Sequence, residues 1–362
     1  MNLSHDYYMK IALNQALKAR GNTSPNPMVG SVLVKNNCII SRGFHKRAGL
    51  PHAEIEAIKK MKGKAEGSRL YVTLEPCCFW GKTPPCTDAI KAAGIKEVII
   101  GMRDPNPKNN GRGIGILRKA GIKVKEGFLK DELKEINEVF VKYITKKMPF
   151  IAVKVGQSLD GKIATKTGNS KWITSELARN YARRLRHNFD AIMVGINTVI
   201  SDNPKLEPAR KKKRFFKIVV DPDLRLHLKA RILSGRDKSI IVAAGLEASQ
   251  FKVKRLEKMG VRVLKVASQG GMLNLKSFLQ RVARLEITSI LVEGGGTLIG
   301  SLFDQRLVDK IYFFIAPKII GGREAISSVM GEGIKSLKNA VQLKSLQVRK
   351  IGKDYLFEGY VK

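Results

Sequence analysis

The sequence predicts an α/β protein with two domains, and three observations support this prediction. The chain has 362 residues, more than one hydrophobic core usually organises. Strand-like apolar runs alternate with helical patterns up to residue 146, as is typical of an α/β layer. The same alternation restarts after Pro149. We therefore expect one domain over residues 1–146 and a second over residues 147–362.

Local patterns predict each element of the first domain. Strand-like runs are expected at residues 30–34, 70–74, 97–101 and 121–124. Helical patterns lie between them at residues 6–19, 53–61, 87–93 and 115–120. A charged helix over residues 131–145 is expected to lead out of the domain.

The second domain is predicted from a longer series of strands. They are expected at residues 150–155, 191–194, 217–220, 239–243, 261–266, 289–292 and 310–315. Helical segments lie between many of them, so this half forms a second α/β domain and not a linker or tail. The sequence contains no internal repeat and no low-complexity segment.

A set of potential metal ligands lies between residues 51 and 86. His52 and Glu54 stand in Pro-His-Ala-Glu, Cys77 follows Glu-Pro, and Cys86 follows Thr-Pro-Pro. One imidazole and two thiolates suit Zn²⁺ and leave a fourth position for water, while Glu54 is free to act as general acid and base. This combination predicts a hydrolytic deaminase site.

The spacing of these residues also has structural meaning. Pro51 suits the first turn of one helix and Pro84-Pro85 the start of another that carries Cys86, so two helix N-termini are expected to favour thiolate at the metal. Deaminases usually carry Pro-Cys-x-x-Cys, whereas the partner of Cys77 here is Cys86. We interpret the added residues as a loop over the pocket, in which Lys82 and Thr83 hold a substrate phosphate. The alternative is a set of buried cysteines with an ordinary histidine at a helix start.

A glycine segment in the second half indicates a nucleotide site. An apolar strand ends at Val292-Glu293 and runs through Gly294-Gly295-Gly296 into a helical pattern. Exposed backbone N–H groups at such a helix start suit a pyrophosphate. On its own the segment is equally compatible with a structural turn, because it is not Gly-x-Gly-x-x-Gly.

Charge and cysteine content restrict the partners and the compartment. Lys and Arg number 67 against 31 acidic residues, a net charge of +36, and the excess runs through both halves. Only residues 210–214 form a dense basic run, so we expect no nucleic-acid partner and attribute the charge to a lysine-rich surface that attracts anionic ligands. Four cysteines, three of them assigned to the metal, favour a reduced cytoplasmic protein. The sequence shows neither a secretory leader nor an apolar run of about 18 residues, so membrane insertion is not expected.

Further motifs accompany these two sites. The first half contains Ser24-Pro25-Asn26-Pro27-Met28-Val29-Gly30, Gly43-Phe44-His45 and Asp104-Pro105-Asn106-Pro107. The second half adds Ser158-Leu159-Asp160-Gly161-Lys162, Trp172-Ile173-Thr174-Ser175, Asp202-Asn203-Pro204 and Ala316-Pro317-Lys318. With the metal and glycine motifs, they resemble the bifunctional riboflavin-biosynthesis family over nearly the whole chain. That family joins a diaminohydroxyphosphoribosylaminopyrimidine deaminase to a 5-amino-6-(5-phosphoribosylamino)uracil reductase.

This resemblance implies a cytidine-deaminase-like first domain and a dihydrofolate-reductase-like second domain that uses NADPH. It implies that His52, Cys77 and Cys86 ligate Zn²⁺, that Glu54 shuttles protons and that Asn26 helps to hold the pyrimidine. The residues implied to contact NADPH are Gly156, Trp172, Thr198, Asp202, Gly295, Gly296, Thr297, Leu298, Ile299, Gly300 and Ser301. The phosphoribosyl substrate is implied to lie among Ser170, Arg186, Leu206, Arg210 and Glu293, with arginine forks matching its phosphate oxygens.

Two other functions are compatible with parts of the sequence. A tRNA or nucleic-acid base deaminase would use the basic second domain to hold RNA, but the cysteine spacing and an aromatic content of 7% argue against it. A non-catalytic zinc- and nucleotide-binding regulator would require both sites to be intact and idle. We expect phosphoribosylated pyrimidines as substrates, and a homo-oligomer is compatible with the sequence.

Overall fold

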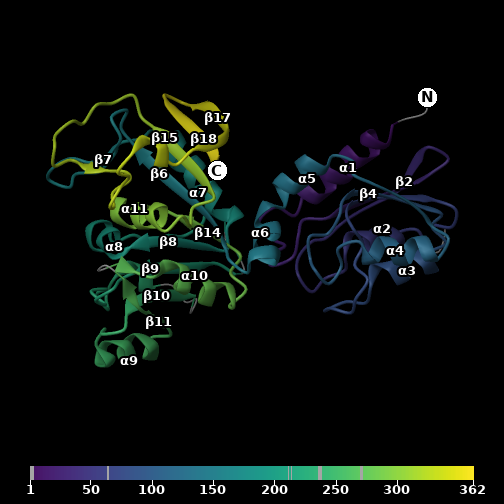
Figure 1. The fold of residues 1–362 in the computed structure, drawn as a ribbon, viewed down its shortest axis with the longest axis horizontal. Coiled ribbons are helices and arrows are strands. Elements are labelled where there is room, and N and C mark those ends of the chain that lie inside the picture. Colours follow the sequence, from purple (N-terminus) through teal and green to yellow (C-terminus); the bar gives the residue numbers. More distant parts are fainter. Residues whose placement is uncertain (1–3, 63–64, 211, 213, 235–238, 270–271) are drawn as a thin grey trace. The chain divides into compact units, whose positions relative to one another are not determined.

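The structure is a computed structural model and describes residues 4–62, 65–210, 212, 214–234, 239–269 and 272–362. Its internal contacts divide the chain into two compact units, unit 1 (Met1–Lys147) and unit 2 (Met148–Lys362). Both units combine helices with a sheet, as the sequence predicts (Figure 1). No helix among the described residues is long and apolar enough to cross a bilayer.

Unit 1 is built on a five-stranded sheet in the order β2-β1-β3-β4-β5. The strands are β1 (Gly30–Lys35), β2 (Cys38–Phe44), β3 (Arg69–Leu74), β4 (Glu97–Met102) and β5 (Lys123–Glu126). β1 runs antiparallel to β2 and β3, whereas β3, β4 and β5 are mutually parallel. The carboxyl ends of the parallel strands meet at one edge of the sheet.

The helices of unit 1 bury the apolar faces of this sheet. They are α1 (His5–Leu17), α2 (Ala53–Lys59), α3 (Cys86–Ala92), α4 (Arg112–Lys119), α5 (Lys130–Ile136) and α6 (Glu138–Lys146). Their inner side chains join those of the strands in one hydrophobic cluster that includes Tyr8, Leu33, Tyr71, Ile99 and Leu117.

The sequence analysis did not anticipate β2. β1 and β2 are joined by Asn36-Asn37, and both residues have positive φ, 52° and 61°. This is the backbone of a tight hairpin turn, and asparagine is one of the few residues that tolerate it. The pair Asn-Asn between two half-apolar runs is the signal that could have revealed the hairpin.

The single helix predicted over residues 131–145 is wrong, because the chain breaks at Asn137 into α5 and α6. The Asn137 side chain pairs with the backbone of Met28: its Oδ1 accepts the Met28 N–H at 2.8 Å and its Nδ2 donates to the Met28 carbonyl at 3.1 Å. Asparagine side chains compete with helical hydrogen bonding in this way.

Asn137→Ala is expected to lower the free energy of unfolding of unit 1 by about 1–3 kcal/mol, because the Met28 N–H would lose its partner. Urea unfolding followed by Trp80 fluorescence, in a Trp172→Phe background, measures this change. Asn22→Ala is the matched control, since the Asn22 side chain is exposed and donates to the nearby Arg20 carbonyl, two positions away. Equal stability of the two alanine variants would contradict the assignment.

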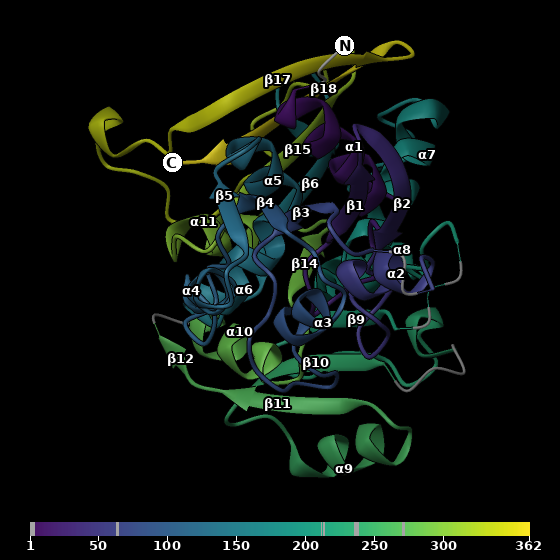
Figure 2. The ribbon, with the colours of Figure 1, turned by 90° about the vertical axis from the view of Figure 1, so that its right-hand side faces the viewer.

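Unit 2 contains a nine-stranded sheet in the order β11-β10-β9-β8-β14-β6-β15-β18-β17. The strands are β6 (Phe150–Gln157), β8 (Ala191–Gly195), β9 (Phe216–Val220), β10 (Ile240–Gly245), β11 (Arg262–Val266), β14 (Ser289–Val292), β15 (Lys310–Ile315), β17 (Leu343–Ile351) and β18 (Asp354–Val361). The strands from β11 to β15 are parallel, and β18 and β17 complete the sheet as an antiparallel hairpin. Figure 2 shows β11 and β17 along the two edges.

Helices cover both faces of this sheet. They are α7 (Glu176–Leu185), α8 (Ile196–Asp202), α9 (Gln250–Lys258), α10 (Leu275–Ala283) and α11 (Gly296–Asp304), with the short 3-10 helices η1 (Arg186–Asn188), η2 (Arg231–Ser234) and η3 (Leu337–Asn339). Ala191 and Met193 of β8 lie in one hydrophobic cluster, and Ile192 and Val194 lie in another. Because β8 is buried on both faces, its sequence is a nearly continuous apolar run.

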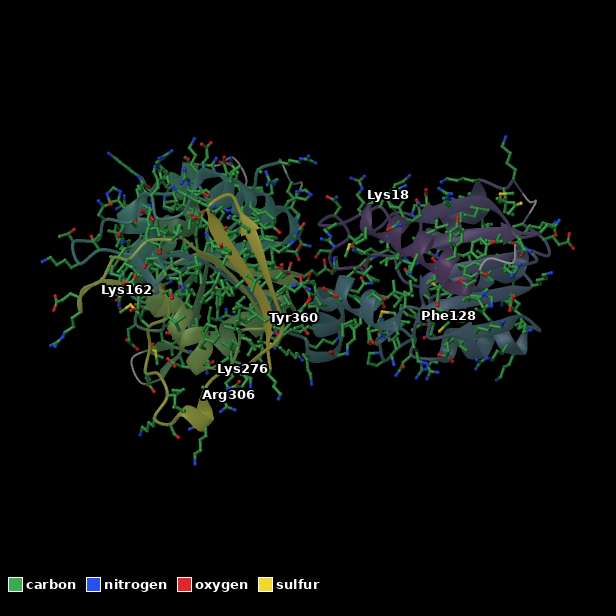
Figure 3. The ribbon with its side chains drawn as sticks, turned by 90° about the horizontal axis from the view of Figure 1, so that it is seen from above. Lys18, Phe128, Lys162, Lys276, Arg306 and Tyr360 are labelled. Atoms are coloured by element: carbon green, nitrogen blue, oxygen red, sulfur yellow. The ribbon has the colours of Figure 1, made fainter. Side chains whose placement is uncertain are left out.

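The sequence analysis missed the smaller strands and the final hairpin. Two short pairs, β7 (Lys162–Ala164) with β16 (Ile326–Ser327) and β12 (Ser268–Gln269) with β13 (Met272–Leu273), lie outside the main sheet. Most residues of β17 are exposed, and apolar and polar residues alternate only weakly along it, so its sequence gives little indication of a strand. Figure 3 shows nitrogen-tipped side chains standing out from the surface of both units, in agreement with a dispersed positive charge.

Candidate functional site

The predicted metal ligands lie together in unit 1. The ligand atoms of His52, Cys77 and Cys86 all fall within 4.8 Å of one another. The Nδ1 atom of His52 is 3.2 Å from Cys86 Sγ and 3.5 Å from Cys77 Sγ. One nitrogen and two sulfurs in this arrangement could hold a metal ion, and they are the donor types of a three-ligand catalytic zinc site.

Local structure explains why these side chains converge. His52 is the N-cap of α2, Cys86 is the first residue of α3 after Pro85, and Cys77 follows β3. The backbone N–H of Cys86 donates to Cys77 Sγ at 3.4 Å, so the start of α3 holds the sulfur in place. Gly43 of β2 lets α2 approach, because a Cβ there would lie 2.1 Å from the Ala53 carbonyl oxygen.

The electrostatics of the cluster favour a thiolate at Cys77. Hydrogen bonding from Cys86 lowers the pKa of Cys77 to about 4 against the effect of burial, and His52 adds to the lowering. The same contact, with burial, raises the pKa of Cys86 well above its usual range. Hydrogen bonding to Cys77 raises the pKa of His52. A negatively charged Cys77 sulfur beside the His52 imidazole suits the binding of a divalent metal ion.

Glu54 lies beside this cluster with one oxygen unused. Its side chain is 3% exposed, and its Oε2 atom is buried with no hydrogen-bond partner among the residues that the structure describes. Burial raises the pKa of Glu54. Buried polar atoms almost always have partners, so an orphaned carboxylate oxygen next to three metal-ligand atoms indicates a ligand or solvent molecule that it is built to meet. The residues present therefore fit a zinc ion with a coordinated water.

A second histidine, His45, lies beside His52 with the ring centroids 5.2 Å apart, and the sequence analysis gave it no role. His45 is 2% exposed, and its Nδ1 atom lies 3.1 Å from the Pro51 carbonyl. Its Nε2 atom lies 3.0 Å from Asn26 Nδ2. If His45 Nδ1 donates to the Pro51 carbonyl, the side-chain Nδ2 of Asn26 must donate to His45 Nε2. The side-chain Oδ1 of Asn26 is then left as an acceptor for a ligand. The Gly-Phe-His motif was the available signal.

The predicted phosphate loop lies at the same site. Thr83 Oγ1 is 3.4 Å from His52 Nε2, so Thr83 contacts the ring nitrogen that faces away from the sulfurs. Lys82 is exposed on this loop, next to Trp80, which is 75% exposed. Cys78 is not part of the ligand cluster: its N–H bonds Asn109 and its sulfur contacts the Lys108 carbonyl.

Glu75 anchors the turn that carries Cys77. Its carboxylate accepts the N–H groups of Asp104, Gly111 and Ile114 at 3.1, 2.9 and 3.2 Å. Burial raises the pKa of the neighbouring Asp104 to about 6. The Asp-Pro-Asn-Pro motif thus helps to hold the turn that carries Cys77, through the bond between the Asp104 N–H and Glu75.

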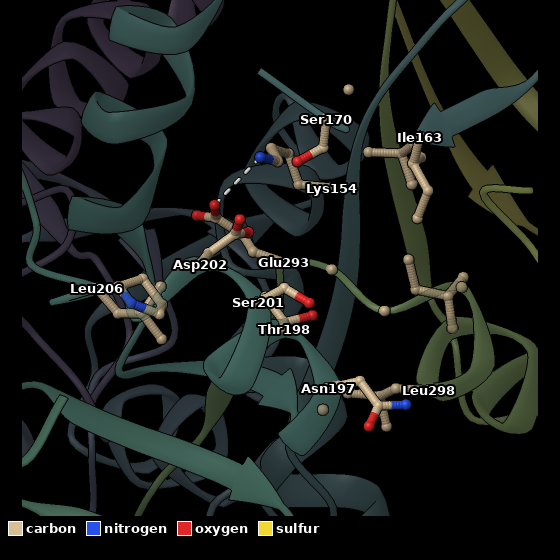
Figure 4. A pocket seen from close by; sticks show the side chains of 18 of the residues that line it. Lys154, Ile163, Ser170, Asn197, Thr198, Ser201, Asp202, Leu206, Glu293 and Leu298 are labelled. Carbon is tan, nitrogen blue, oxygen red and sulfur yellow. Dashed lines mark hydrogen bonds and ion pairs between the residues drawn. The ribbon is translucent and has the colours of Figure 1, made fainter. Parts of the chain in front are cut away.

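Unit 2 contains a cavity of about 1220 Å³ at the carboxyl edge of its parallel strands. In open α/β sheets, ligands bind at this edge. The cavity is lined by most of the residues predicted for cofactor and substrate, namely Gly156, Ser170, Trp172, Arg186, Thr198, Asp202, Leu206, Glu293, Gly295, Gly296, Thr297, Leu298, Ile299 and Ser301. Figure 4 shows several of these side chains from close by.

Two predicted residues, Gly300 and Arg210, do not line this cavity. Gly300 packs against the backbone of Met330, where a Cβ would fall 0.9 Å from the Met330 carbonyl oxygen, so its place is set by packing. The Met330 N–H also donates to the Gly296 carbonyl at 3.0 Å. Arg210 is exposed on the basic run. Within that run, Lys212 donates to the carbonyls of His187 and Phe189.

A buried charge cluster lies inside the cavity. Glu293 accepts two bonds from Arg186, at 2.7 and 3.0 Å, and one from Lys154 at 3.1 Å. Arg186 also donates to the Glu207 carbonyl at 2.8 Å, so its guanidinium is largely occupied. Sequence reasoning missed Lys154, whose pairing with Glu293 spans 139 positions. Figure 4 shows this ion pair as a dashed line.

The charge cluster makes the stability of unit 2 pH-dependent. Burial opposes ionisation of Glu293, yet Lys154 and Arg186 lower its pKa to about 2 from the usual 4.5. A lowered folded-state pKa stabilises the protein above about 4.5, and this contribution is lost as the pH falls towards 2.

We expect Glu293→Gln to destabilise unit 2 at pH 7 by about 3–5 kcal/mol, because two buried cations lose their counter-ion. The difference from wild type should narrow between pH 4.5 and 2. Urea unfolding followed by Trp172 fluorescence in a Trp80→Phe background reports on unit 2. A difference that stays constant over this pH range would contradict the assigned ion pairs.

Trp172 forms part of the cavity wall and is 61% exposed. The Arg179 guanidinium lies 4.2 Å from its ring centroid, and Lys318 Nζ donates to its carbonyl at 2.8 Å. The predicted Trp-Ile-Thr-Ser and Ala-Pro-Lys motifs therefore meet at this wall.

Comparison with known proteins agrees with both units. Residues 3–102 match the family model for the cytidine and deoxycytidylate deaminase zinc-binding region, and residues 149–357 match that for the RibD C-terminal domain. Riboflavin biosynthesis protein RibD of Aquifex aeolicus (strain VF5) is 43% identical over 96% of both chains. The protein of the same name from Escherichia coli (strain K12) is 36% identical over 97% of this chain and 98% of its own.

Solved structures give the same result. Acinetobacter baumannii RibD, form 1, aligns with a TM-score of 0.89 and 32% identity over 99% of this chain and 98% of its own. A diaminohydroxyphosphoribosylaminopyrimidine deaminase/5-amino-6-(5-phosphoribosylamino)uracil reductase from Thermotoga maritima aligns with a TM-score of 0.86 and 36% identity over the same shares. With a cytidine-deaminase-like unit, a RibD reductase unit and this level of identity along its length, the chain belongs to the RibD family of riboflavin-biosynthesis proteins.

Proposed function

We propose that the chain catalyses two successive steps of riboflavin biosynthesis. The first is zinc-dependent hydrolytic deamination of 2,5-diamino-6-(5-phosphoribosylamino)pyrimidin-4-one. The second is NADPH reduction of the ribosyl group of 5-amino-6-(5-phosphoribosylamino)uracil to ribityl. The observation that carries the proposal is the unpartnered, buried Glu54 oxygen beside three metal-ligand atoms, in a chain related to deaminase/reductase proteins along its length.

In the deaminase unit, His52, Cys77 and Cys86 would hold the metal. A zinc ion in such a set lowers the pKa of a water molecule to about 7, which makes a nucleophile available at neutral pH. Glu54 would take the two protons of the attacking water in turn and pass one to the ring nitrogen and the other to the departing amino group, because its Oε2 atom has no partner among the described residues. Asn26, oriented by His45, hydrogen-bonds the pyrimidine, and Lys82 and Thr83 meet the phosphate.

In the reductase unit, the residues mainly orient two ligands. NADPH would supply a hydride to C1′ of the ribose once its ring has opened to the Schiff base, and a proton from solvent would complete the reduction. The glycine segment from Gly294 to Gly296 leaves backbone N–H groups for its pyrophosphate at the start of α11. Lys154 presents an ammonium group that Glu293 holds in place, so it can hydrogen-bond the sugar near the reacting carbon.

The predicted substrate residues of unit 2 divide into two groups. Ser170, Leu206 and Glu293 line the cavity with Lys154. Arg186 is committed to Glu293 and the Glu207 carbonyl, so in this proposal it positions Glu293, while Arg210 approaches the phosphate from the exposed segment. Gly156, Trp172 and Asp202 remain with the nicotinamide cofactor.

The proposal extends to compartment and association. A cytoplasmic location keeps the two ligand thiols reduced, as zinc binding requires. Self-association along β17 is favoured by its free sheet edge and by three apolar side chains on it, Leu343, Leu346 and Val348, which are 38–52% exposed. Light scattering of the purified protein distinguishes a monomer from an oligomer.

Product mass spectrometry tests the two reactions separately. Incubation of the zinc-loaded protein with the diamino substrate should replace an amino group by oxygen and release ammonia. Addition of NADPH should then add two hydrogens to the product. Full deamination by chelator-treated protein, or no NADPH oxidation with the deaminated substrate, would contradict the corresponding half of the proposal.

A further inference from the structure

We propose that Arg225 binds the 2′-phosphate of the adenosine half of NADPH and thereby makes unit 2 select NADPH over NADH. This inference rests on the proposed reductase function and deepens it, because it assigns the choice between the two cofactors to a residue. Arg225 lines the same cavity as the glycine segment but lies beyond the residues that the resemblance implicated.

The cavity follows a row of strand ends, which gives it a direction. Gly195 pairs with Val220, and Val292 pairs with both Met193 and Val153, so the carboxyl ends of β9, β8, β14 and β6 form a row, with β6 continuing past the others to Gln157. Adjacent strands are about 4.8 Å apart, so these four ends span about 14 Å. A dinucleotide laid across them places its pyrophosphate near β14, where the glycine segment begins.

The two ends of this row differ in chemistry. At the β6 end lie Gly156, Lys154 and Glu293, the groups that suit the reacting sugar and the nicotinamide. At the β9 end, the cavity is lined by Pro222 and by the apolar side chains of Val220, Met272, Leu273 and Leu275. Figure 4 shows Lys154 and Ser170 at one end and Asn197 and Leu298 at the other, with Thr198 between them.

Arg225 belongs to the β9 end. Its Nη2 atom donates to Asn197 Oδ1 at 2.6 Å, and Asn197 is on the first turn of α8, next to Gly195. An apolar slot beside a guanidinium suits an adenine ring and the phosphate on its ribose. Arginine is the residue that commonly accommodates the 2′-phosphate where α/β folds bind NADP.

The backbone that carries Arg225 is fixed. Asp221 is fully buried, and its two carboxylate oxygens accept the N–H groups of Arg225 and Leu226 at 2.8 and 2.7 Å. The segment is therefore held before any ligand arrives, which reduces the entropy lost on binding.

The charge of Arg225 is available to a ligand. Whereas Arg186 is occupied by Glu293, the Arg225 guanidinium is exposed and forms no salt bridge with any residue that the structure describes. Arg231 lines the cavity on the same segment and adds positive charge there, against one carboxylate, Asp223. The balance at this end favours a phosphate over a free 2′-hydroxyl.

Binding measurements test the assignment without relying on turnover. We would titrate the zinc-loaded full chain with NADPH, with NADH and with adenosine 2′,5′-bisphosphate by calorimetry, for wild type and for Arg225→Gln. Arg225→Gln should raise the Kd for NADPH and the bisphosphate by about ten- to a hundredfold, the usual loss for a charge-assisted hydrogen bond. The Kd for NADH should change by less than about twofold, and Arg225→Lys should recover part of the affinity. Lys229→Gln is the matched control, because it removes an exposed charge from the same segment without lining the cavity.

The outcomes distinguish a failure of the proposed reductase function from a failure of the role assigned to Arg225. A wild-type protein that binds neither nicotinamide cofactor defeats the reductase function itself. If wild type prefers NADPH but Arg225→Gln retains that preference, or if the variant weakens NADPH and NADH equally, the function stands and the role of Arg225 is overturned. An equal effect of Lys229→Gln would show that only general electrostatic attraction is involved.

Discussion

Replacing Glu54 with glutamine is expected to lower kcat for deamination by a factor of about 10² to 10⁴, the range that a positioned general acid and base contributes. The side chain is buried and its Oε2 atom has no protein partner, so the carboxylate is the only protein group so placed among the described residues beside the ligand cluster. Glutamine keeps the shape but cannot carry the proton. Ammonia release from the diamino substrate, measured without NADPH, reports this step alone.

Two controls distinguish this loss from misfolding. Glu56→Gln makes the same charge change two positions along α2, where the carboxylate pairs with Lys46 at 3.2 Å, and should leave deamination nearly unchanged. Glu54→Gln should also retain bound zinc and the reduction of the deaminated substrate, since the reductase cavity is lined by unit 2 residues alone. Undiminished ammonia release by Glu54→Gln would rule out the assigned proton transfer.

Cys86→Ala is expected to abolish stoichiometric zinc binding and to lower deamination by at least about 10³-fold, because a three-ligand site loses one ligand and with it the activated water. The neighbouring cysteine supplies a sharp comparison. Cys78→Ala removes a thiol that lies next to Cys77 in sequence but contacts the Lys108 carbonyl instead of the cluster. Zinc content by elemental mass spectrometry and ammonia release should stay normal in that variant.

The opposite result would be equally clear. If Cys78→Ala lost its zinc while Cys86→Ala kept it, the ligand spacing of nine residues would be wrong. The two sulfurs of the predicted pair lie within 4.8 Å of each other and of a histidine nitrogen, so the geometry favours Cys86.

The elements that the sequence predicts well are those whose local signals agree with their surroundings. Pro84-Pro85 predicted a helix start, and α3 begins at Cys86 with Pro85 as its N-cap. The strand at Ser289–Val292 is buried throughout and was predicted with its observed bounds. A short run of mostly apolar residues between turn signals is typical of a fully buried strand, so its pattern is easy to recognise.

The errors arise where a distant partner decides the structure. Residues 131–145 read as one helix because nothing local reveals that Asn137 pairs with Met28, 109 positions away. The final hairpin escaped because β17 is exposed over nearly its whole length, and an exposed strand needs no hydrophobic alternation.

The candidate sites follow the same division. The ligand set of His52, Cys77 and Cys86 could be proposed from residue types and order alone. The orientation of Asn26 by His45 and the occupation of Arg186 by Glu293 could not, since each depends on which atoms meet across the fold. A sequence motif indicates which residues belong to a site. Only the hydrogen-bond geometry of the fold shows how many of their donors remain for a ligand.

The contact between Gly300 and Met330 links parts of unit 2 that are distant in sequence. The stretch before Met330 is also bonded to the start of β7, because the Ser328 N–H donates to the Gly161 carbonyl and Lys162 Nζ to Ser327 Oγ, both at 3.0 Å. The same stretch bonds the first turn of α11 through Met330. A single methyl group added at position 300 would therefore push residues 327–330 away from α11 and displace both the glycine segment and the Ser-Leu-Asp-Gly-Lys loop.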